Sequence, residues 1–77
     1  MPATLQTTIQ MVRLQLGRPE VKADDRIVED LGAESMDIVN IVAALEERFG
    51  LAIDEAALPE IRSVRDLAEL VARGRNG

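Results

Sequence analysis

The chain has 77 residues, carries a formal net charge of −5, and contains no cysteine, no histidine and a single aromatic residue, Phe49. A chain of this length predicts one small domain over residues 1–77, which buries only about 60% of its extended surface and has no room for a large enclosed active site. The missing residue types exclude disulfides, thiol nucleophiles and most zinc sites. Without a basic patch or an aromatic platform, nucleic-acid binding is not expected, and basic proteins are the favoured partners.

No stretch approaches the roughly eighteen uninterrupted apolar residues of a membrane span, because Asn40, Glu46 and Glu47 break the most hydrophobic segment. The first residues show no basic segment followed by a hydrophobic block, so no secretory signal is predicted. These patterns indicate a cytoplasmic protein without a membrane span.

Two clear amphipathic helices are predicted in the first two thirds of the chain. The first covers residues 4–16 and ends at Gly17 and Pro19. The second covers residues 35–49 and ends at Gly50. Their apolar faces share one spacing and comprise Leu5, Ile9, Val12 and Leu16 in the first helix, and Ile38, Val42, Leu45 and Phe49 in the second, widened by Ile41.

The connection over residues 17–34 has no sustained period, and a loop of that length in a small domain suggests a function. We expect Ile27, Val28 and Leu31 to pin it to the core.

Residues 51–61 support at most one short turn of helix around Pro59. The spacing of Ser63 and Asp66 is typical of a capping box and begins the last helix, whose apolar face comprises Val64, Leu67, Ala68 and Val71. Arg73 to Gly77 is expected to fray. Three main helices and one short helix, without an alternating strand pattern, predict an all-α, small antiparallel four-helix bundle with a long first loop.

Ser35 is the candidate functional residue, because a glycine turn delivers it to the start of the second helix. Serine caps helices routinely, so capping is the ordinary interpretation. A helix N-terminus also favours negative charge, so a phosphate esterified to this serine would be electrostatically favoured. The position alone leaves both interpretations open.

The stretch from Asp25 to Asp37, which reads DRIVEDLGAESMD, resembles the acyl carrier proteins. The later segment ALEERF, ending at Phe49, also matches their pattern in spacing, and the similarity extends from about Asp24 to Val71. The resemblance implies a four-helix bundle that is not an enzyme. It also implies that Ser35 carries 4'-phosphopantetheine, delivered from coenzyme A by a phosphopantetheinyl transferase, with acyl cargo held as a thioester.

The second helix has a further apolar stripe, which its angular spacing places outside the core face: Met36, Val39 and Ala43. Glu34, Asp37, Glu46 and Glu47 add an acidic rim, and acids in a last helical turn oppose the helix dipole. Ordinary surface exposure explains such residues equally well. The resemblance implies instead that acyl-loading and acyl-processing enzymes dock on this helix.

Glu34 and Met36 replace the usual aspartate and leucine around the serine, while Asn40 and Arg48 stand where fatty-acid carriers commonly place acids. These departures favour a specialised carrier with its own partners, for a fatty-acid, lipid or polyketide pathway. The carrier is expected to be a discrete, monomeric protein. An aminoacyl or peptidyl carrier of a nonribosomal pathway is one alternative, and an unmodified helical adaptor is another.

An enzyme is the remaining possibility, with paired carboxylates or a weak cation site in the acidic connector; the candidates are Asp24, Asp25, Glu29 and Asp30. Acid–base catalysis needs carboxylates held in a dry cleft, whereas an acidic connector of a small domain is generally solvated. We therefore expect no catalytic residue and no metal site.

Overall fold

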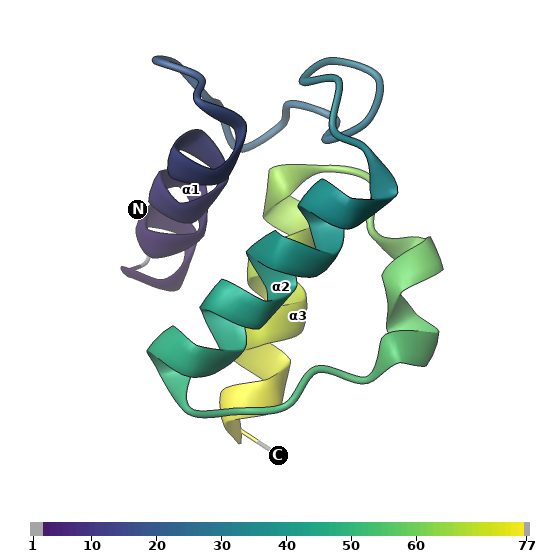
Figure 1. Cartoon of the computed structure of the whole chain (residues 1–77). Coiled ribbons are helices and arrows are strands. Elements are labelled where there is room, and N and C mark those ends of the chain that lie inside the picture. Colours follow the sequence, from purple (N-terminus) through teal and green to yellow (C-terminus); the bar gives the residue numbers. More distant parts are fainter. Residues whose placement is uncertain (1–2, 77) are drawn as a thin grey trace.

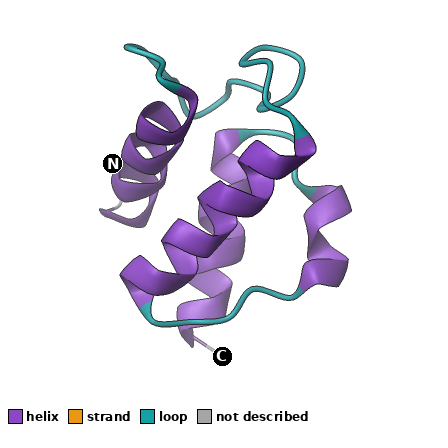
Figure 2. Cartoon of the chain, in the orientation of Figure 1, coloured by secondary structure: helices purple, strands orange, loops and turns teal. Residues whose placement is uncertain are grey.

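The computed structural model describes residues 3–76 and contains three α-helices and one short 3-10 helix (Figure 1). The elements are α1 (Ala3–Leu16), α2 (Ser35–Phe49), η1 (Glu55–Glu60) and α3 (Val64–Asn76). Figure 2 shows loops between them and no strand among the described residues. No helix in residues 3–76 has the length and apolar character needed to cross a bilayer. The predicted all-α fold is confirmed.

Consecutive elements alternate in direction (Figure 1). The chain rises through α1, descends through α2, returns through η1 and descends again through α3, so α2 and α3 run the same way. Helix α1 packs on both α2 and α3. The C-terminal end of α1 and the N-terminal end of α2 therefore lie at the same end of the bundle.

The core lies between the three α-helices and the inner side of the first connection. Glycines in the left-handed conformation end α1 and α2, at Gly17 with a φ of 63° and Gly50 with a φ of 66°. In α2 the fully buried positions are Ile41, Val42 and Leu45, whereas Ile38 and Phe49 are only partly buried. All four apolar residues predicted for the core face of the last helix, Val64, Leu67, Ala68 and Val71, are buried.

The connection between α1 and α2 is pinned to the core at more points than the sequence indicated. Ile27 and Leu31 are buried as predicted, and Val21 and Ala33 are buried as well. The prediction for Val28 was wrong, because its side chain is 51% exposed. Its neighbour Ile27 is buried instead, because the N–H of Ile27 is bonded to the carbonyl of Arg62 before α3.

Backbone hydrogen bonds tie this connection to the start of α3. The N–H of Ile27 donates to the carbonyl of Arg62 at 2.8 Å, and the N–H of Val64 donates to the carbonyl of Asp25 at 3.1 Å. Arg65 N–H adds a bond to the carbonyl of Ala23 at 2.8 Å. A single antiparallel bridge between Arg26 and Ser63 thus holds the connection against the start of α3 without forming a sheet.

Two boundaries differ from the sequence-based expectation. Residues 55–60 form about two turns of 3-10 helix rather than one, because the side chain of Asp54 caps the segment by accepting from the N–H of Ala56 at 2.9 Å. The helical backbone also continues past Arg73 to Asn76, and the fraying expected of residues 73–77 stays a prediction. Gly77, the last residue of that prediction, lies outside the described residues.

Candidate functional site

Ser35 is the first residue of α2 and is exposed, but it is not the N-cap. Glu34 occupies the cap position with extended backbone, at φ −94° and ψ 168°. The carboxylate of Asp37 accepts a hydrogen bond from the N–H of Glu34 at 2.9 Å, which is one half of a capping box. The ordinary interpretation of Ser35 as a capping residue is therefore wrong, and its hydroxyl has no hydrogen-bonding role in the described structure.

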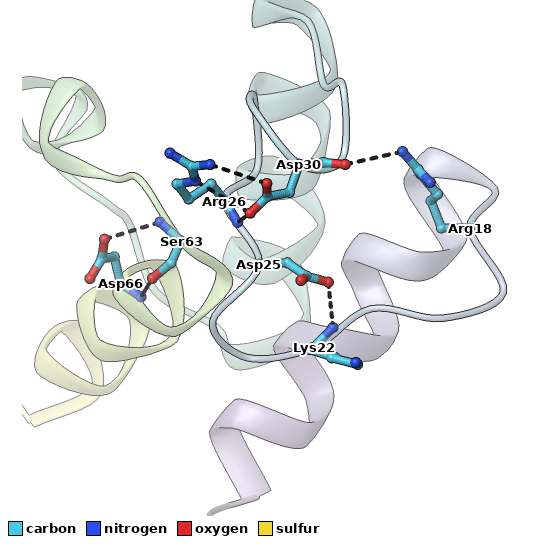
Figure 3. Close-up of polar contacts among 7 residues, drawn as sticks. All are labelled: Arg18, Lys22, Asp25, Arg26, Asp30, Ser63 and Asp66. Carbon is cyan, nitrogen blue, oxygen red and sulfur yellow. Dashed lines mark hydrogen bonds and ion pairs between the residues drawn. The ribbon is translucent and has the colours of Figure 1, made fainter.

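The loop that delivers Ser35 is held by side chains of its own residues (Figure 3). The carboxylate of Asp30 accepts from the backbone N–H of Arg26 at 2.8 Å and pairs with the Arg26 guanidinium at 3.3 Å. The backbone bond and the guanidinium together lower the pKa of Asp30 below its ordinary value of 3.8. Arg18 donates to the carbonyl oxygen of Asp30 at 3.3 Å, so the end of α1 also supports this turn.

The last step into α2 depends on one glycine and one alanine. Gly32 adopts a φ of 70°, which is unfavourable for residues with a side chain, and its N–H donates to the carbonyl of Val28 at 3.0 Å. The N–H of Ala33 donates to the carbonyl of Ile27 at 3.1 Å while its methyl group is buried. Because the N–H of Ala33 is bonded and its methyl group is buried, the backbone that leads to Ser35 two residues later is held in place.

The surroundings of Ser35 suit a phosphoester. The first backbone N–H groups of α2 have no carbonyl acceptor within the helix, and the helix dipole places partial positive charge at this end. The hydroxyl is open to solvent and its modification would break no contact of the fold. The residues present therefore fit a covalently attached phosphate-bearing group.

The apolar stripe predicted for the outside of α2 is exposed as expected. Met36 is 66% and Val39 50% exposed, and Ala43 lies on the same open surface. Val28 adds a further exposed apolar side chain on the turn that immediately precedes Ser35. Val28 was expected in the core, although its position directly beside Ile27 was a usable signal that only one of the two faces inward.

The four acids near this surface have different surroundings. Glu34 and Glu47 are exposed, whereas Asp37 is half-buried and bonded to the N–H of Glu34. Glu46 is also half-buried, and its carboxylate accepts from the N–H of Ile53 at 2.7 Å. The expectation that Glu46 only opposes the helix dipole was wrong, because it fixes the chain that leaves α2.

The acidic connector shows structural uses for its carboxylates. Asp24 pairs with the guanidinium of Arg65 at 3.0 Å, and Asp25 accepts from the backbone N–H of Lys22 at 2.8 Å. Asp30 holds the turn described above, and Glu29 is exposed. Among residues 3–76 no three acidic side chains gather in a way that would hold a metal ion. Asp24, Asp25 and Asp30 are thus engaged in folding the loop.

Comparison with known proteins agrees with this geometry. Residues 6–71 match the family model described as the phosphopantetheine attachment site. An acyl carrier protein of Campylobacter hominis is 39% identical over 59 residues, covering 77% of this chain and 75% of its own. One from Nitratidesulfovibrio vulgaris is 39% identical over 64 residues, covering 83% and 84%. The solved structure of a Thermotoga maritima acyl carrier protein has a TM-score of 0.78 at 24% identity, covering 94% of this chain and 86% of its own.

These matches define a class of phosphopantetheine-bearing carriers rather than of enzymes. The chain belongs to the acyl carrier protein family, and 4'-phosphopantetheine is the prosthetic group of that family. The resemblance drawn from the two sequence motifs is therefore confirmed.

Proposed function

We propose that Ser35 is the residue that carries 4'-phosphopantetheine and that the protein is a discrete acyl carrier. The observation that supports this most strongly is the free, exposed hydroxyl of Ser35 at a helix N-terminus whose capping is done by its neighbours. The chain has one other serine, Ser63, and its half-buried hydroxyl accepts a hydrogen bond from the N–H of Asp66 at 3.1 Å. Ser35 is thus the serine that a transferase reaches without disturbing the fold.

In the loading step the Ser35 oxygen forms a phosphoester bond with the phosphopantetheine phosphorus of coenzyme A. The phosphoanhydride bond of coenzyme A breaks, adenosine 3',5'-bisphosphate leaves, and the serine proton passes to a base of the transferase. The attached group supplies a terminal thiol that holds acyl cargo as a thioester. This chain contributes the open hydroxyl, the positive end of α2 and the rigid loop that fixes both.

Intact-mass spectrometry after incubation with coenzyme A, magnesium and a broad-specificity phosphopantetheinyl transferase tests the assignment. The wild type gains one phosphopantetheine mass, and Ser35→Ala gains none. Ser63→Asn is the matched control, because asparagine retains helix capping but offers no hydroxyl, and it is modified like the wild type. Modification of Ser35→Ala would overturn the site. A wild type that several transferases leave unmodified would favour the helical adaptor instead.

The outer face of α2 is the proposed docking surface for the transferase and for acyl-loading and acyl-processing enzymes. It combines the exposed apolar side chains of Met36, Val39 and Ala43 with the exposed carboxylates of Glu34 and Glu47. Asp37 and Glu46 border it, although both also stabilise the fold. We add Val28 to this surface, since it is exposed on the turn before Ser35.

Stopped-flow binding to the transferase at low and high salt separates the two contributions. Glu47→Lys slows association and flattens its salt dependence, because rim charges act mainly on the encounter rate. Met36→Ala shortens the lifetime of the complex, because an apolar anchor is desolvated only after docking. Glu69→Lys on α3 makes the same charge change at another exposed site. If Glu69→Lys lowers the association rate and Glu47→Lys does not, the docking surface lies elsewhere.

A specialised fatty-acid, lipid or polyketide pathway is the proposed context. Arg48 supports it, because it stands where fatty-acid carriers commonly place an acid. Its guanidinium lies 5.7 Å from the centre of the Phe49 ring and gives the end of α2 a positive charge. An aminoacyl or peptidyl carrier is the alternative. The two alternatives are distinguished by testing whether acyl ligases or amino-acid-activating enzymes load the phosphopantetheine-bearing protein. The cytoplasmic location and monomeric state remain predictions.

A further inference from the structure

The acidic residues of this chain are unevenly distributed. All 14 lie at or after Glu20, so the first 19 residues contain none, although the whole chain has a net charge of −5. Within residues 3–19 the charged side chains are Arg13 and Arg18. The exposed side of α1 is otherwise made of uncharged residues, including Gln10. Helix α1 itself therefore carries no acidic side chain, although Arg18 also lies with Glu20, Asp25 and Asp30 around a neighbouring depression.

The end of α1 is also hollowed. A depression of about 520 Å³ is lined by Gln10, Arg13, Leu14, Gly17, Arg18 and Pro19. Leu14 is 79% exposed, more than Val28, Met36 or Val39. We call these six residues the α1 end patch. The depression is shallow and open, so a partner's side chain can reach Leu14 from solvent.

Arg13 and Arg18 line the same depression as Leu14, and their backbones are joined by a hydrogen bond. Gly17, in the left-handed conformation, turns the chain back so that the N–H of Arg18 donates to the carbonyl of Arg13 at 3.1 Å. The Arg18 side chain makes one bond, to the carbonyl of Asp30 (Figure 3), while Arg13 makes no ion pair with the described residues. A base in the last helical turn offsets the helix dipole, which explains Arg13 but not the exposed Leu14.

We infer that the α1 end patch binds an acidic segment of a partner protein that presents a leucine-like side chain. Carboxylates pair with Arg13 and the free N–H groups of Arg18, and the apolar side chain covers Leu14 in the hollow. The α1 end patch lies at the same end of the bundle as the start of α2 (Figure 1), so one partner can contact it while working at Ser35. Its charge preference is opposite to that of α2.

Nuclear magnetic resonance titration of the ¹⁵N-labelled full chain, without phosphopantetheine, tests the inference. The probe is a short synthetic peptide of glutamate and leucine, compared with one of glutamate and serine and one of lysine and leucine. The glutamate–leucine peptide shifts the amide signals of residues 10–18 saturably and in a salt-dependent manner, and the other two bind more weakly. Because this assay does not use the attached group, its failure would leave the Ser35 proposal standing, and the reverse also holds.

Variants locate the binding. Arg13→Glu and Leu14→Ser each weaken the glutamate–leucine peptide about tenfold, because one removes a charge partner and the other the apolar contact. Arg73→Glu on α3 is the charge-matched control and leaves binding unchanged. Circular dichroism melts verify that the variants fold.

Other occupants of the α1 end patch would overturn the inference. Shifts of residues 10–18 that grow with protein concentration alone would assign the patch to a second copy of this chain. Shifts with vesicles containing phosphatidylglycerol but not with the glutamate–leucine peptide would assign it to a lipid surface. No saturable shift with any probe, or unchanged binding by Arg13→Glu and Leu14→Ser, would also refute it.

Discussion

Helices α2 and α3 begin in closely similar ways, but their serines serve different purposes. At the start of α3 the N–H of Ser63 donates to the carboxylate of Asp66 at 3.0 Å, and the Ser63 hydroxyl accepts from the N–H of Asp66 at 3.1 Å. At the start of α2 the N–H of Glu34 donates to Asp37 at 2.9 Å. Both helices use an aspartate three residues after the cap. In α3 the serine is the cap residue itself, whereas in α2 the serine follows the cap residue.

That shift of one residue is what frees Ser35. Because Glu34 occupies the cap position, the hydroxyl of Ser35 has no bond to make and points to solvent. The hydroxyl of Ser63 is committed to its helix. The same capping device thus produces one structural serine and one available serine.

The largest effects on stability come from the core behind both helix starts. Leu45→Ala lowers the free energy of unfolding by about 2–5 kcal/mol, because Leu45 is fully buried between the helices. Val39→Ala, on the exposed side of α2, costs less than about 1 kcal/mol. Phe49→Ala falls between them, since Phe49 is only partly buried. Thermal melts followed by circular dichroism measure the series, and equal losses at all three positions would contradict the assignment of faces.

The two serines separate at the next level of effect. Ser63→Ala lowers the free energy of unfolding by about 0.5–2 kcal/mol through loss of its capping bond. Ser35→Ala changes it by less than about 0.5 kcal/mol, because no hydrogen bond is lost. Urea denaturation measures both values, provided that the unfolding free energy depends on urea concentration with the same slope in all three proteins. A loss at Ser35 as large as that at Ser63 would mean that Ser35 caps α2 after all.

The smallest effect is a pH dependence carried by the start of α3. The N–H of Ser63, helped by that of Arg62, lowers the pKa of Asp66 below its ordinary value of 3.8. A lowered pKa in the folded state adds stability above the unfolded value, and that stability is lost as the pH falls through the folded value. Wild type therefore loses more stability than Asp66→Asn between about pH 5 and about pH 3.

Urea midpoints measured across that range decide the point. Asp30→Asn provides the comparison in the loop before α2, because the pKa of Asp30 is lowered by the backbone N–H of Arg26 and by its guanidinium. Asp30→Asn, like Asp66→Asn, loses less stability than the wild type as the pH falls. A pH dependence that is identical in wild type and in both variants would show that neither carboxylate contributes.

Sequence patterns correctly predicted the features that depend on residues close together in the chain. The spacing of Leu5, Val12 and Leu45 identified the buried faces, and Gly17 and Gly50 identified the helix ends, because periodicity and a left-handed turn depend on residues close in the chain. The capping box of Ser63 and Asp66 was found for the same reason.

Positions whose surroundings come from distant segments were predicted poorly. Val28 and Ile27 are equally apolar in sequence, and only the bonds from this turn to Arg62 at the start of α3 determine which of them faces inward. The structural role of Glu46 likewise depends on the N–H of Ile53, seven residues on, which reaches it through the turn at Gly50.

The sequence by itself determined the helical class, the C-terminal ends of α1 and α2 and the family motif around Ser35, because each depends on residue types at short, fixed spacings. Only the tertiary structure decided that Glu34 rather than Ser35 caps α2, that Val28 lies outside and that Arg13 and Arg18 flank a hollow. The outward position of Val28 depends on how the connection between α1 and α2 is held against α3, and contacts between segments far apart in the chain set that arrangement. The cap at Glu34 and the depression at the end of α1 depend on local backbone geometry that the residue types alone leave open.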